Sequence, residues 1–406
     1  MRDRDLYAKI LGLADPWVVA DVELDVKAQS VVVHLGRQEE ATLACPECGK
    51  MCPGYDTQPR RWRHLDTCQF ETILAAEVPR CSCPEHGVKQ IRVPWAEPGS
   101  RFTALFECLA IDWMQEAGRS ATARQLGLSW READGIMQRA VDRGLACRPA
   151  VTTPVLGVDE KSFQGREFVT VVCDLDDGHV LHIADGRGSE ALATCYAAMT
   201  DGQRQAVEAV AMDMHQPYVQ ATQSALPEAT IVFDKFHIAK LASEAVDQVR
   251  RLENKELTAA GDDRLKGTRY HWLRNPLQET REQKATAKNI RSSKLKTARA
   301  WQLKETLMDF FRYFREADAQ RFFGEWYAWA SRCRLKPMQR LAKTLKSRLT
   351  TLLNWCHWPI TNAITEGLNS KIQWIKYTAR GFRSRDGFRR AIFFHCGKLD
   401  LYPQSL

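Results

Sequence analysis

Long apolar runs are missing from this chain of 406 residues, and its start, MRDRDLYAKILGLADPW, lacks the apolar core of a secretory signal. A helix needs about 20 consecutive apolar residues to cross a bilayer, and a secretory signal needs a shorter apolar core. Internal repeats and low-complexity tracts are also missing, which argues against a repeat architecture or a long disordered segment. We therefore expect a cytoplasmic globular protein with no membrane partner.

The chain also lacks the even number of cysteines that a set of disulfides requires. The chain has 13 cysteines, and we find no export signal. Disulfide frameworks are typical of short secreted chains with an even cysteine count, so we do not expect one here. Metal binding or simple burial must account for these thiols.

Acidic residues are scarce in one segment. Between Arg251 and Thr350, 24 Lys and Arg residues stand against 11 Asp and Glu residues, although the whole chain has a net charge of only +8. A concentrated basic segment favours a polyanionic partner such as nucleic acid. A solvated helical surface explains the same charge equally well.

Length and pattern predict several domains. A chain of 406 residues exceeds the size at which a single core keeps growing. Strand-like runs cover 18–26 and 30–35, a linker with two prolines follows at 94–99, and residues 102–145 have the spacing of helices. The pattern predicts a strand-rich N-terminal domain followed by a helical one.

A different pattern begins near Pro154. Three strand-like runs, PVLGVD, EFVTVVCDL and GHVLHIADG, are separated by turn residues, and DLDDGH carries the Asp-Gly signal of a hairpin. Helix, strand, helix and strand follow in SEALATCYAAMT, QAVEAVAMD, QPYVQATQSAL and ATIVFD, and residues 237–358 have helical spacing almost throughout. The runs predict a mixed-sheet α/β domain into which a long helical segment is inserted.

Two short pairs of metal-type ligands lie in the N-terminal domain. Cys45 and Cys48 form one pair, and Cys83 and His86 form the other, each with two residues between its members. Structural zinc prefers closed tetrahedral shells of nitrogen and sulfur. The pairs predict one structural Zn²⁺ held by these four residues, and scattered buried cysteines are the simpler alternative.

The zinc assignment leaves competing ligands. The gap between the two pairs is 34 residues, longer than a compact ribbon usually has, so Cys52, Cys68, Cys81 and His64 remain candidates. A catalytic zinc of the deaminase kind needs a His-x-Glu motif together with Pro-Cys-x-x-Cys. The chain has neither motif, which makes that class of enzyme a poor fit.

The stretch SATARQLGLSWREADGIMQRAV, residues 120–141, has the pattern of a helix-turn-helix. Ala123 and Gly127 lie four residues apart, and Ser129 offers a cap for a second, amphipathic helix. Small residues permit close packing of the two helices, and the glycine permits the turn. Helix pairs of this kind also occur in proteins that touch no DNA. If this pair does bind DNA, the reading helix presents Ser129, Trp130, Arg131, Gln138 and Arg139.

Carboxylates end three strand-like runs of the α/β domain, at Asp159, Asp213 and Asp234. Strand ends of such a sheet converge near one edge, where ligands usually bind. Two or three carboxylates together suit Mg²⁺, a hard cation that prefers oxygen ligands. Each carboxylate taken singly is better explained as the cap of a following helix.

Glu160 directly follows Asp159 and raises the question of which carboxylate serves the site. Side chains alternate along a strand, so Asp159 shares a face with Val155 and Gly157, whereas Glu160 points to the opposite face. We expect Asp159 to be the metal ligand. We also expect Gly157 to leave room for the metal and a phosphate.

Four motifs, VLGVDEKSF, AMDMHQPYV, IVFDKFHIAK and ITEGLNSKIQWIKYTARGFR, occur in this order after a cysteine-rich N-terminus with CPEHG and VPWAEPGSRFT. In these motifs, and along nearly its whole length, the chain resembles the DDE transposases of the ISL3 family of bacterial insertion sequences. The resemblance implies an RNase H-like catalytic domain with a carboxylate triad on Asp159, Asp213 and Glu366. It also implies a helical insertion before Glu366, which agrees with the interval of 153 residues after Asp213.

Helical spacing alone makes Glu366 an ordinary exposed glutamate, because it lies nearly opposite the apolar stripe of its predicted helix. The resemblance instead directs this polar face, with Asn369, Ser370 and Gln373, toward metal and DNA. The role of Glu366 therefore rests on the resemblance.

The resemblance further implies a transposase that binds terminal inverted repeats, hydrolyses a phosphodiester at each end and joins the freed 3′-hydroxyl to target DNA. Asp159, Asp213 and Glu366 would hold two Mg²⁺ ions, for which Mn²⁺ can substitute. The partners would be double-stranded DNA, both element ends and target, and a second copy of the chain in a homodimer or larger oligomer. A bacterial enzyme of this kind would be nucleoid-associated when bound. Two alternatives remain, a DNA-binding regulator without catalysis and a metal-dependent nuclease without strand transfer.

These inferences give a multidomain α/β protein of five segments. They are a strand-rich zinc-binding domain (1–97), a helix-turn-helix domain (98–150), the first part of the catalytic domain (151–240), a basic helical insertion (241–358) and C-terminal catalytic helices (359–406).

Overall fold

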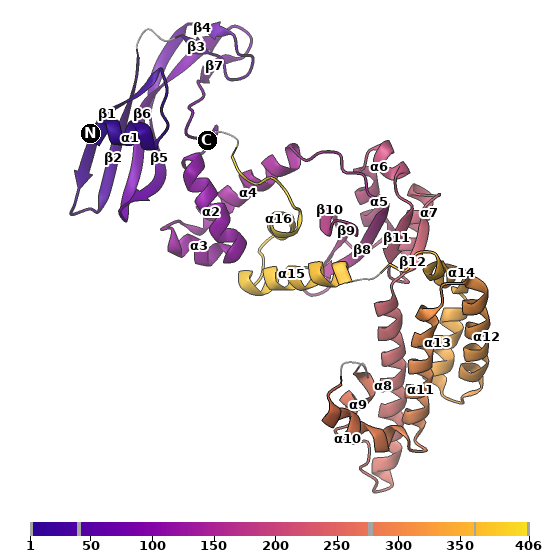
Figure 1. Ribbon diagram of the computed structural model, residues 1–406. Coiled ribbons are helices and arrows are strands. Elements are labelled where there is room, and N and C mark those ends of the chain that lie inside the picture. Colours follow the sequence, from indigo (N-terminus) through magenta and orange to yellow (C-terminus); the bar gives the residue numbers. More distant parts are fainter. Residues whose placement is uncertain (1–2, 39–41, 275–278, 361–362, 404–406) are drawn as a thin grey trace. The chain divides into compact units, whose positions relative to one another are not determined.

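The computed structural model describes residues 3–38, 42–274, 279–360 and 363–403 and divides the chain into two compact units (Figure 1). The first unit comprises Met1–Pro149 together with Trp374–Leu406. The second unit comprises Ala150–Gln373.

A five-stranded sheet dominates the N-terminal part of the first unit. Its strand order is β1-β2-β6-β5 with β7 paired to β6, and only β2 and β6 run parallel. The strands are β1 (Trp17–Asp25), β2 (Ser30–Arg37), β5 (Gly54–Thr67), β6 (Phe70–Cys83) and β7 (Gly87–Gln90). Helix α1 (Asp3–Ile10) packs on β1, and two short strands, β3 (Leu43–Ala44) and β4 (Met51–Cys52), pair with each other. The strands predicted at 18–26 and 30–35 are confirmed as β1 and β2.

The core of this sheet follows from alternation along its strands. In β6, Leu74, Ala76 and Val78 are buried at every second position, as expected for a sheet with one covered face. Three tryptophans complete the core, with the rings of Trp17 and Trp62 both edge-on to Trp95 at centroid distances of 4.8 and 5.4 Å. Edge-to-face pairs of this kind add to the stabilisation from burial.

Four helices complete the first unit: α2 (Ala104–Glu116), α3 (Arg119–Gln125), α4 (Trp130–Ala146) and α16 (Arg385–Cys396). Helix α16 packs on α4, and Gly144 of α4 permits the close approach of the segment after α16, because a Cβ there would lie 2.6 Å from Leu399. The contacts therefore group the chain from Trp374 onward with α4. Residues 359–406 were predicted to belong to the catalytic domain, and the domain bounds stay predictions.

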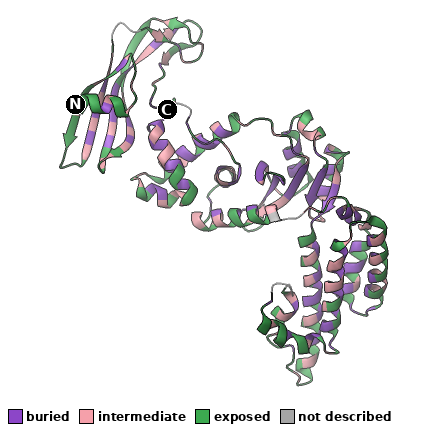
Figure 2. Ribbon diagram, viewed as in Figure 1, coloured by how far each residue is buried: buried purple, intermediate pink, exposed green. Residues whose placement is uncertain are grey.

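A second five-stranded sheet forms the centre of the second unit, in the order β10-β9-β8-β11-β12. The strands are β8 (Val155–Ser162), β9 (Phe168–Asp174), β10 (His179–Asp185), β11 (Ala209–Met212) and β12 (Thr230–Phe233). β8, β9 and β10 are antiparallel, whereas β8, β11 and β12 run parallel. The predicted mixed-sheet α/β domain is confirmed, and Figure 2 shows its strands largely in the colour of buried residues.

Three helices accompany this sheet: α5 (Ser189–Ala197), α6 (Asp201–Gln205) and α7 (Gln216–Ala225). The buried rings of Tyr196 and Tyr218 pack against the strands in one continuous core. Their hydroxyls are satisfied by Thr222 and Thr170, each at 2.9 Å, so the core holds these polar atoms without leaving them unpaired.

The predicted helical insertion is confirmed between β12 and α15 (Ala363–Ala379). Buried aromatic side chains, including Trp272, Phe310 and Trp326, hold the insertion together. Asn354 ties its C-terminal end to β12 by donating its Nδ2 hydrogen to the Ile231 carbonyl at 2.8 Å. The insertion contains α8 (Lys235–Ala259), α9 (Arg269–Leu273), α10 (Arg281–Arg291), α11 (Lys296–Met308), η2 (Asp309–Arg312), α12 (Glu316–Arg332), α13 (Lys336–Lys346), α14 (Leu349–Leu353) and η3 (Asn354–Cys356).

Within the described part of the chain, no helix combines the length and the apolar character that a membrane span requires.

Candidate active site, metal centre and DNA-binding helix

The structure brings together the four residues predicted to bind zinc. Cys45 and Cys48 lie between β3 and β4, and Cys83 and His86 lie at the β6–β7 turn. Their ligand atoms all lie within 4.8 Å of one another. Cys48 Sγ is 3.8 Å from Cys83 Sγ, and His86 Nδ1 is 3.8 Å from Cys45 Sγ and 3.6 Å from Cys83 Sγ. Ligands about 2.3 Å from a central ion in a tetrahedron are about 3.8 Å apart, so the spacing fits zinc.

Local hydrogen bonds favour the thiolate at this cluster. Burial opposes the charge on Cys83, but backbone N–H groups of Glu85 and His86, with the Cys45 and Cys48 thiols, outweigh it and lower its pKa to about 7. N–H groups directed at sulfur stabilise the anion that a metal requires.

The competing ligands lie elsewhere. Cys81 is buried with its Sγ toward the Ala44 carbonyl, and Cys68 is exposed at the β5–β6 turn. His64 is buried and its Nδ1 is 2.9 Å from Thr103 Oγ1. None of these, nor Cys52, joins the four-residue cluster in the described part of the chain.

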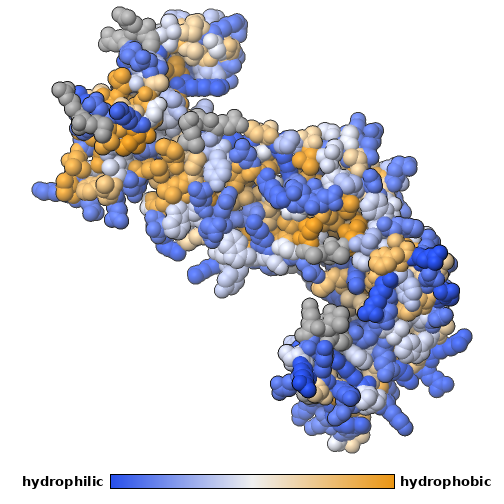
Figure 3. Space-filling view, in the orientation of Figure 1, coloured by the Kyte–Doolittle hydropathy of each residue, from blue (hydrophilic) through white to orange (hydrophobic). Residues whose placement is uncertain are grey.

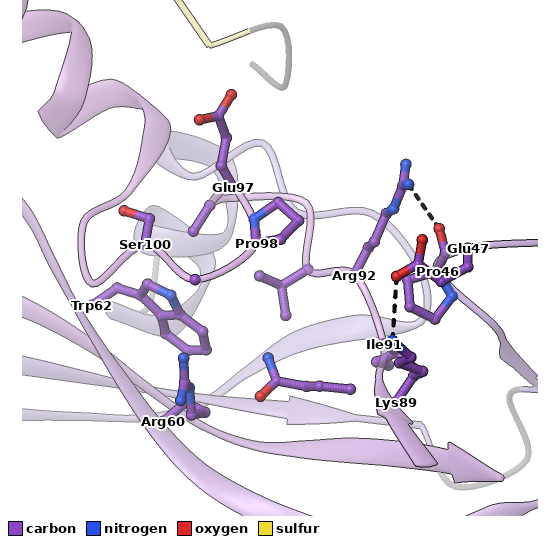
Figure 4. A pocket seen from close by; sticks show the side chains of 14 residues that line it. Pro46, Glu47, Arg60, Trp62, Lys89, Ile91, Arg92, Glu97, Pro98 and Ser100 are labelled. Atoms are coloured by element: carbon purple, nitrogen blue, oxygen red, sulfur yellow. Dashed lines mark hydrogen bonds and ion pairs between the residues drawn. The ribbon is translucent and has the colours of Figure 1, made fainter. Parts of the chain in front are cut away.

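A pocket of about 360 Å³ lies between the loop with Pro46 and Glu47 and the linker residues Glu97 to Ser100 (Figure 4). Arg92 donates to the Pro46 carbonyl at 2.7 Å, and Lys89 forms an ion pair with Glu47 at 3.5 Å. Both acceptors lie between Cys45 and Cys48 in the sequence. β7 and the residues directly after it therefore help to position the loop between Cys45 and Cys48.

The predicted helix-turn-helix is formed by α3 and α4. Gly127 has φ +66° in the turn, a conformation that glycine adopts without strain. Ser129 caps α4, accepting from the Glu132 N–H while the Glu132 side chain accepts from the Ser129 N–H. This capping box fixes where the second helix begins.

The predicted DNA-reading residues divide between two faces of α4. Trp130, Arg131 and Gln138 are exposed, and Arg131 and Gln138 lie two turns apart on one face. Arg139 is half-buried and turned inward, with its Nε 3.0 Å from the buried Glu107 carboxylate. Arg139 therefore joins α4 to α2, and its position gives it a structural contact.

Three carboxylates line up where the parallel part of the second sheet ends. Asp213 and Asp234 directly follow β11 and β12, but Asp159 was wrongly expected to end its strand, since β8 continues to Ser162 in its pairing with β9. β8 and β11 are in parallel register at Gly157 and Ala211, and β11 and β12 at Met212 and Phe233. Continuing both registers sets Asp159 beside Asp213, and Asp213 beside Asp234. Neighbouring strands are about 4.8 Å apart, so the sheet itself gathers these acids at one edge.

His237 links two of these acids. Its Nδ1 lies 2.6 Å from an Asp213 oxygen and 2.5 Å from an Asp234 oxygen. Burial opposes the charge on the imidazole, but the ion pairs with the two carboxylates outweigh it and raise its pKa to about 10. Asp213, Asp234 and His237 form a second cluster of ligand atoms within 4.8 Å of one another.

Asp234 also caps α8, because its carboxylate accepts from the Phe236 N–H at 2.7 Å. The simpler explanation offered for a strand-end aspartate thus holds for Asp234, which serves as a cap and pairs with His237. Asp213 precedes α7 but gives it no side-chain cap, since His215 occupies the cap position.

Asp159 is held by groups of the chain. Lys161, two residues further along β8 and so on the same face, approaches one carboxylate oxygen at 2.6 Å. Asn369 of α15 donates its Nδ2 hydrogen to the same oxygen at 2.9 Å. The Glu160 N–H donates to the other oxygen at 2.7 Å. Asp159 is 12% exposed and Lys161 11%, so both are accessible only along a narrow edge.

Glu366 lies on α15, one turn before Asn369. Positions three apart on a helix share a face, so the turn that contacts Asp159 also carries Glu366. Gly178 in the β9–β10 turn brings the start of this helix close, since a Cβ there would lie 3.3 Å from Ile364. The Glu366 side chain is exposed. It does not form a common ligand cluster with Asp159 and Asp213 in the described residues.

The expected role of Gly157 was wrong. A Cβ at this position would lie 2.7 Å from Leu175 and 2.9 Å from Cys173 Sγ, so side chains of the core fill the space. The glycine is needed for the close packing of β8, and it leaves no room for a metal or a phosphate.

At the acidic edge, Lys161 was missed from the sequence, and Asn369 was placed on the polar face of its helix without its partner Asp159. Lys161 could have been found by the same alternation that separated Asp159 from Glu160. Asn369 lies 210 positions from its partner, and no local pattern connects the two.

A cysteine-histidine cluster, a helix-turn-helix and an acidic sheet edge together define a DNA-processing protein with its own DNA-binding domain. Comparison with known families identifies it further. The chain belongs to the ISL3 family of transposases, because the family model described as "Transposase" matches residues 156–392. The model described as "zinc-finger of transposase IS204/IS1001/IS1096/IS1165" matches 42–86, and "Helix-turn-helix domain of transposase family ISL3" matches 91–141.

Similar proteins carry the same kind of name. The transposase for insertion sequence element IS1557 of Mycobacterium tuberculosis is 27% identical over 422 residues, covering 95% of this chain and 93% of that protein. The transposase for insertion sequence element IS1001 of Bordetella parapertussis is 28% identical over 358 residues, covering 85% and 87%. The resemblance drawn from the four motifs is confirmed.

Proposed function

We propose that this transposase binds the terminal inverted repeats of its element, cleaves a phosphodiester at each end and joins the freed 3′-hydroxyl to target DNA. One observation carries the proposal. The register of three parallel strands gathers Asp159, Asp213 and Asp234 at one edge, and α15 adds the turn that bears Glu366 and Asn369. We infer an RNase H-like catalytic domain from this arrangement and from the family.

The carboxylates suit a hard divalent cation, so the residues present fit Mg²⁺. We propose that Asp159, Asp213 and Glu366 hold it, with Mn²⁺ as a substitute. Bound there, the metal would activate the attacking oxygen and stabilise the leaving oxygen. Glu366 is exposed and has no hydrogen-bond or ion-pair partner in the described residues, which leaves its carboxylate free to bind.

The chain's own cations contribute to the same site. Lys161 and His237 offset the mutual repulsion of the carboxylates, because each lies in contact with at least one of them. Asn369 fixes the rotamer of Asp159 by its hydrogen bond. Asp234 is engaged by His237 and by the α8 N-terminus, so we assign it a positioning role.

In the first unit, we propose that Cys45, Cys48, Cys83 and His86 hold a structural Zn²⁺, which fits the tetrahedral spacing of their ligand atoms. The shell is closed by four protein ligands, as in structural sites. We propose that α4 enters the major groove with Trp130 and Arg131 near its N-terminus and Gln138 two turns later. Ser129 positions this helix, and Arg139 supports it from inside.

The functional test is a cleavage and joining assay with the full chain. Labelled duplexes that carry the element's ends are incubated with Mg²⁺, with EDTA, or with a scrambled end sequence, and a second duplex serves as target. We expect cleaved and joined products only with true ends and Mg²⁺. Selective binding without cleavage would instead identify a DNA-binding regulator, and cleavage without joining would identify a nuclease. Because paired ends must be held together, we also expect a homodimer or larger assembly on DNA.

A further inference from the structure

Helix α13 of the insertion carries a cationic ridge, which we define as Lys336, Arg340, Lys343 and Lys346. The helix sequence, KPMQRLAKTLK, contains no acidic residue. Its other face, with Met338, Leu341, Ala342 and Leu345, is buried where α13 packs on α8 and α12. Hydrophilic side chains cover much of the insertion on the face shown in Figure 3.

The ridge cations are exposed and none forms an ion pair with a described residue. Two arginines elsewhere in the insertion are engaged: Arg250 pairs with Asp247 at 2.8 Å and Arg291 with Glu279 at 2.6 Å. Arg340 meets only the neutral Gln248 side chain, at 3.1 Å, and Lys346 lies 4.5 Å from the centre of the Tyr327 ring. These contacts hold the side chains in place without neutralising them.

The spacing of the ridge suits a line of phosphates. Lys336, Arg340 and Lys343 follow the four- and three-residue steps that keep side chains on one helical face. With a rise of 1.5 Å per residue the whole ridge extends about 15 Å. Duplex DNA presents one negative charge per about 1.7 Å of its axis, so several phosphates fit along this length. Like charges on adjacent turns destabilise a helix, and phosphates would relieve that cost.

The ridge also leads toward the acidic edge. Arg340 lies beside Gln248, which is about 21 Å along α8 from Asp234 at that helix's cap. Arg348, just after α13, lies 5.7 Å from the ring of Phe233, the residue directly before Asp234. α13 therefore runs back along α8 toward the carboxylates, in agreement with Figure 1.

We propose that the α13 ridge binds the sugar–phosphate backbone of the double-stranded DNA whose phosphodiester enters the site of Asp159 and Asp213. This inference rests on the proposed function and names the surface that holds its substrate. The α13 sequence contains no aromatic residue, so the surface is built for phosphates and not for stacking on unpaired bases. Contacts to phosphate are independent of base sequence, and α4 supplies the sequence reading.

The insertion offers a matched control for the experiment. Arg281, Lys284 and Lys288 of α10 are also three exposed cations on a helix. α10 lies with α9 and the start of α11 toward the other end of α8, away from the sheet (Figure 1). Replacing three cations by Gln on either helix changes the net charge by the same amount.

The test measures the affinity of the full chain for a duplex of fixed length at several salt concentrations. The variants are Lys336→Gln/Arg340→Gln/Lys343→Gln and Arg281→Gln/Lys284→Gln/Lys288→Gln. Each lost phosphate contact makes the slope of log affinity against log salt less steep by about 0.9, so we expect a change of about 2.7 for α13. We expect a change below about 1 for α10. An equal change of slope in both variants, or no change of slope in the α13 variant, would overturn the proposal that the ridge binds DNA.

Two further measurements make the outcome decisive. Lys336→Arg/Lys343→Arg should keep the wild-type slope, because charge and not the ammonium group is needed. Circular dichroism of the Gln variants should match wild type and their thermal midpoints should not fall below it, since Gln is a good helix former and like charges are removed. The same titrations with single-stranded DNA complete the set. If the α13 Gln variant loses affinity only for single-stranded DNA, the proposal is overturned.

Failure of the proposed function gives a different pattern. In that case wild type neither prefers element ends nor cleaves them, whatever the slope of either variant. If wild type cleaves element ends and the α13 variant keeps both slope and cleavage rate, the ridge alone is wrong.

Discussion

The two ligand clusters of this chain differ in the way their charges are balanced. In the first unit, three sulfurs and an imidazole nitrogen face one another at tetrahedral spacing. At the edge of the second sheet, the carboxylates already contact cations of the chain, Lys161 at Asp159 and His237 at Asp213 and Asp234. The first arrangement suits one permanently held soft ion. The second suits hard ions that replace Lys161 and His237 as partners of the carboxylates and keep some coordination positions open for substrate.

The clusters also differ in how the fold assembles them. Two short turns bring the cysteines and His86 together, so that cluster depends on the metal for its local structure. Three buried parallel strands hold the acids, and their positions follow from the sheet register. We therefore expect metal removal to unfold the first site. At the second site it should abolish catalysis and leave the fold intact.

Metal removal is the largest expected effect. Structural zinc contributes on the order of 10 kcal/mol to folding in small zinc modules, so stripping it should unfold residues 42–86, and Mg²⁺ should not rescue them. Removing Mg²⁺ should abolish cleavage with no change in circular dichroism. Cys83→Ser should mimic zinc loss, whereas Cys52→Ser, outside the cluster, should retain one zinc per chain by elemental analysis. A folded, DNA-binding wild type without zinc would contradict the assignment.

Loss of a catalytic carboxylate is the next effect in size. Asp159→Asn, Asp213→Asn and Glu366→Gln should each lower cleavage and joining by about 10³-fold, equivalent to about 4 kcal/mol of barrier. DNA binding should survive because the fold keeps its shape.

Glu160→Gln is the matched control for these variants and should stay active. Asp234→Asn should keep substantial activity, because Asn also caps helices well. An inactive Glu160→Gln beside an active Asp159→Asn would show that the face assignment along β8 is reversed.

The internal cation of the acidic edge gives the third prediction. His237→Gln leaves the carboxylates of Asp213 and Asp234 without their shared partner, and we expect a loss of about 3 kcal/mol without Mg²⁺. Mg²⁺ should raise the thermal midpoint of this variant more than that of wild type, because binding replaces the missing charge. His215→Gln, which changes a nearby imidazole without removing an ion pair to either acid, should show the wild-type response. If Mg²⁺ raises the thermal midpoint equally in wild type, His237→Gln and His215→Gln, then Mg²⁺ does not replace the charge of His237 at these carboxylates.

Acid should weaken the first unit for a second reason besides zinc release. Burial, assisted by the neighbouring Arg63, lowers the pKa of His64 to about 4. The unfolded chain takes up this proton near pH 6.5 and the folded chain only near 4, so stability falls as pH decreases through that window. The loss reaches about 3 kcal/mol. In denaturant titrations between pH 7 and 4, the free energy of unfolding should fall less in His64→Gln than in wild type. If it falls equally with pH in both proteins, His64 does not cause the acid sensitivity.

The smallest effects separate Arg131 from Arg139. Arg131→Gln should lower discrimination between element ends and unrelated duplex by about 1–3 kcal/mol if it contacts a base. Arg139→Gln should instead lower the thermal midpoint, since it removes the close partner of Glu107, and leave discrimination unchanged. Competition binding and thermal melts on both variants measure the difference. If Arg139→Gln instead lowers discrimination between element ends and unrelated duplex and keeps the wild-type thermal midpoint, Arg139 contacts DNA.

Sequence patterns predicted the fold where the signal is local. The apolar runs PVLGVD, AVAM and TIVF specified strands, and turn residues between the runs specified a mixed sheet. The capping box at Ser129 and the turn at Gly127 were equally visible, because caps and turns depend on neighbouring residues. Paired spacing likewise indicated the Cys45, Cys48, Cys83 and His86 set.

Side-chain contacts over long distances could not be predicted in this way. The sequence placed Arg139 beside Arg131 as a DNA contact, but its partner Glu107 lies on another helix, 32 positions away. The packing of Leu175 and Cys173 against Gly157 likewise depends on strand register, and no single segment encodes it.

The sequence by itself thus determined the order of domains, the paired cysteines and the two acids that directly follow β11 and β12, because each depends on periodicity or spacing within a few residues. Tertiary structure alone decided which ligands meet, that Lys161, His237 and Asn369 hold the acids, and that the segment following α13 reaches the residue before Asp234. These contacts join residues tens to hundreds of positions apart, and only the packing of sheet and helices brings such residues within hydrogen-bonding distance.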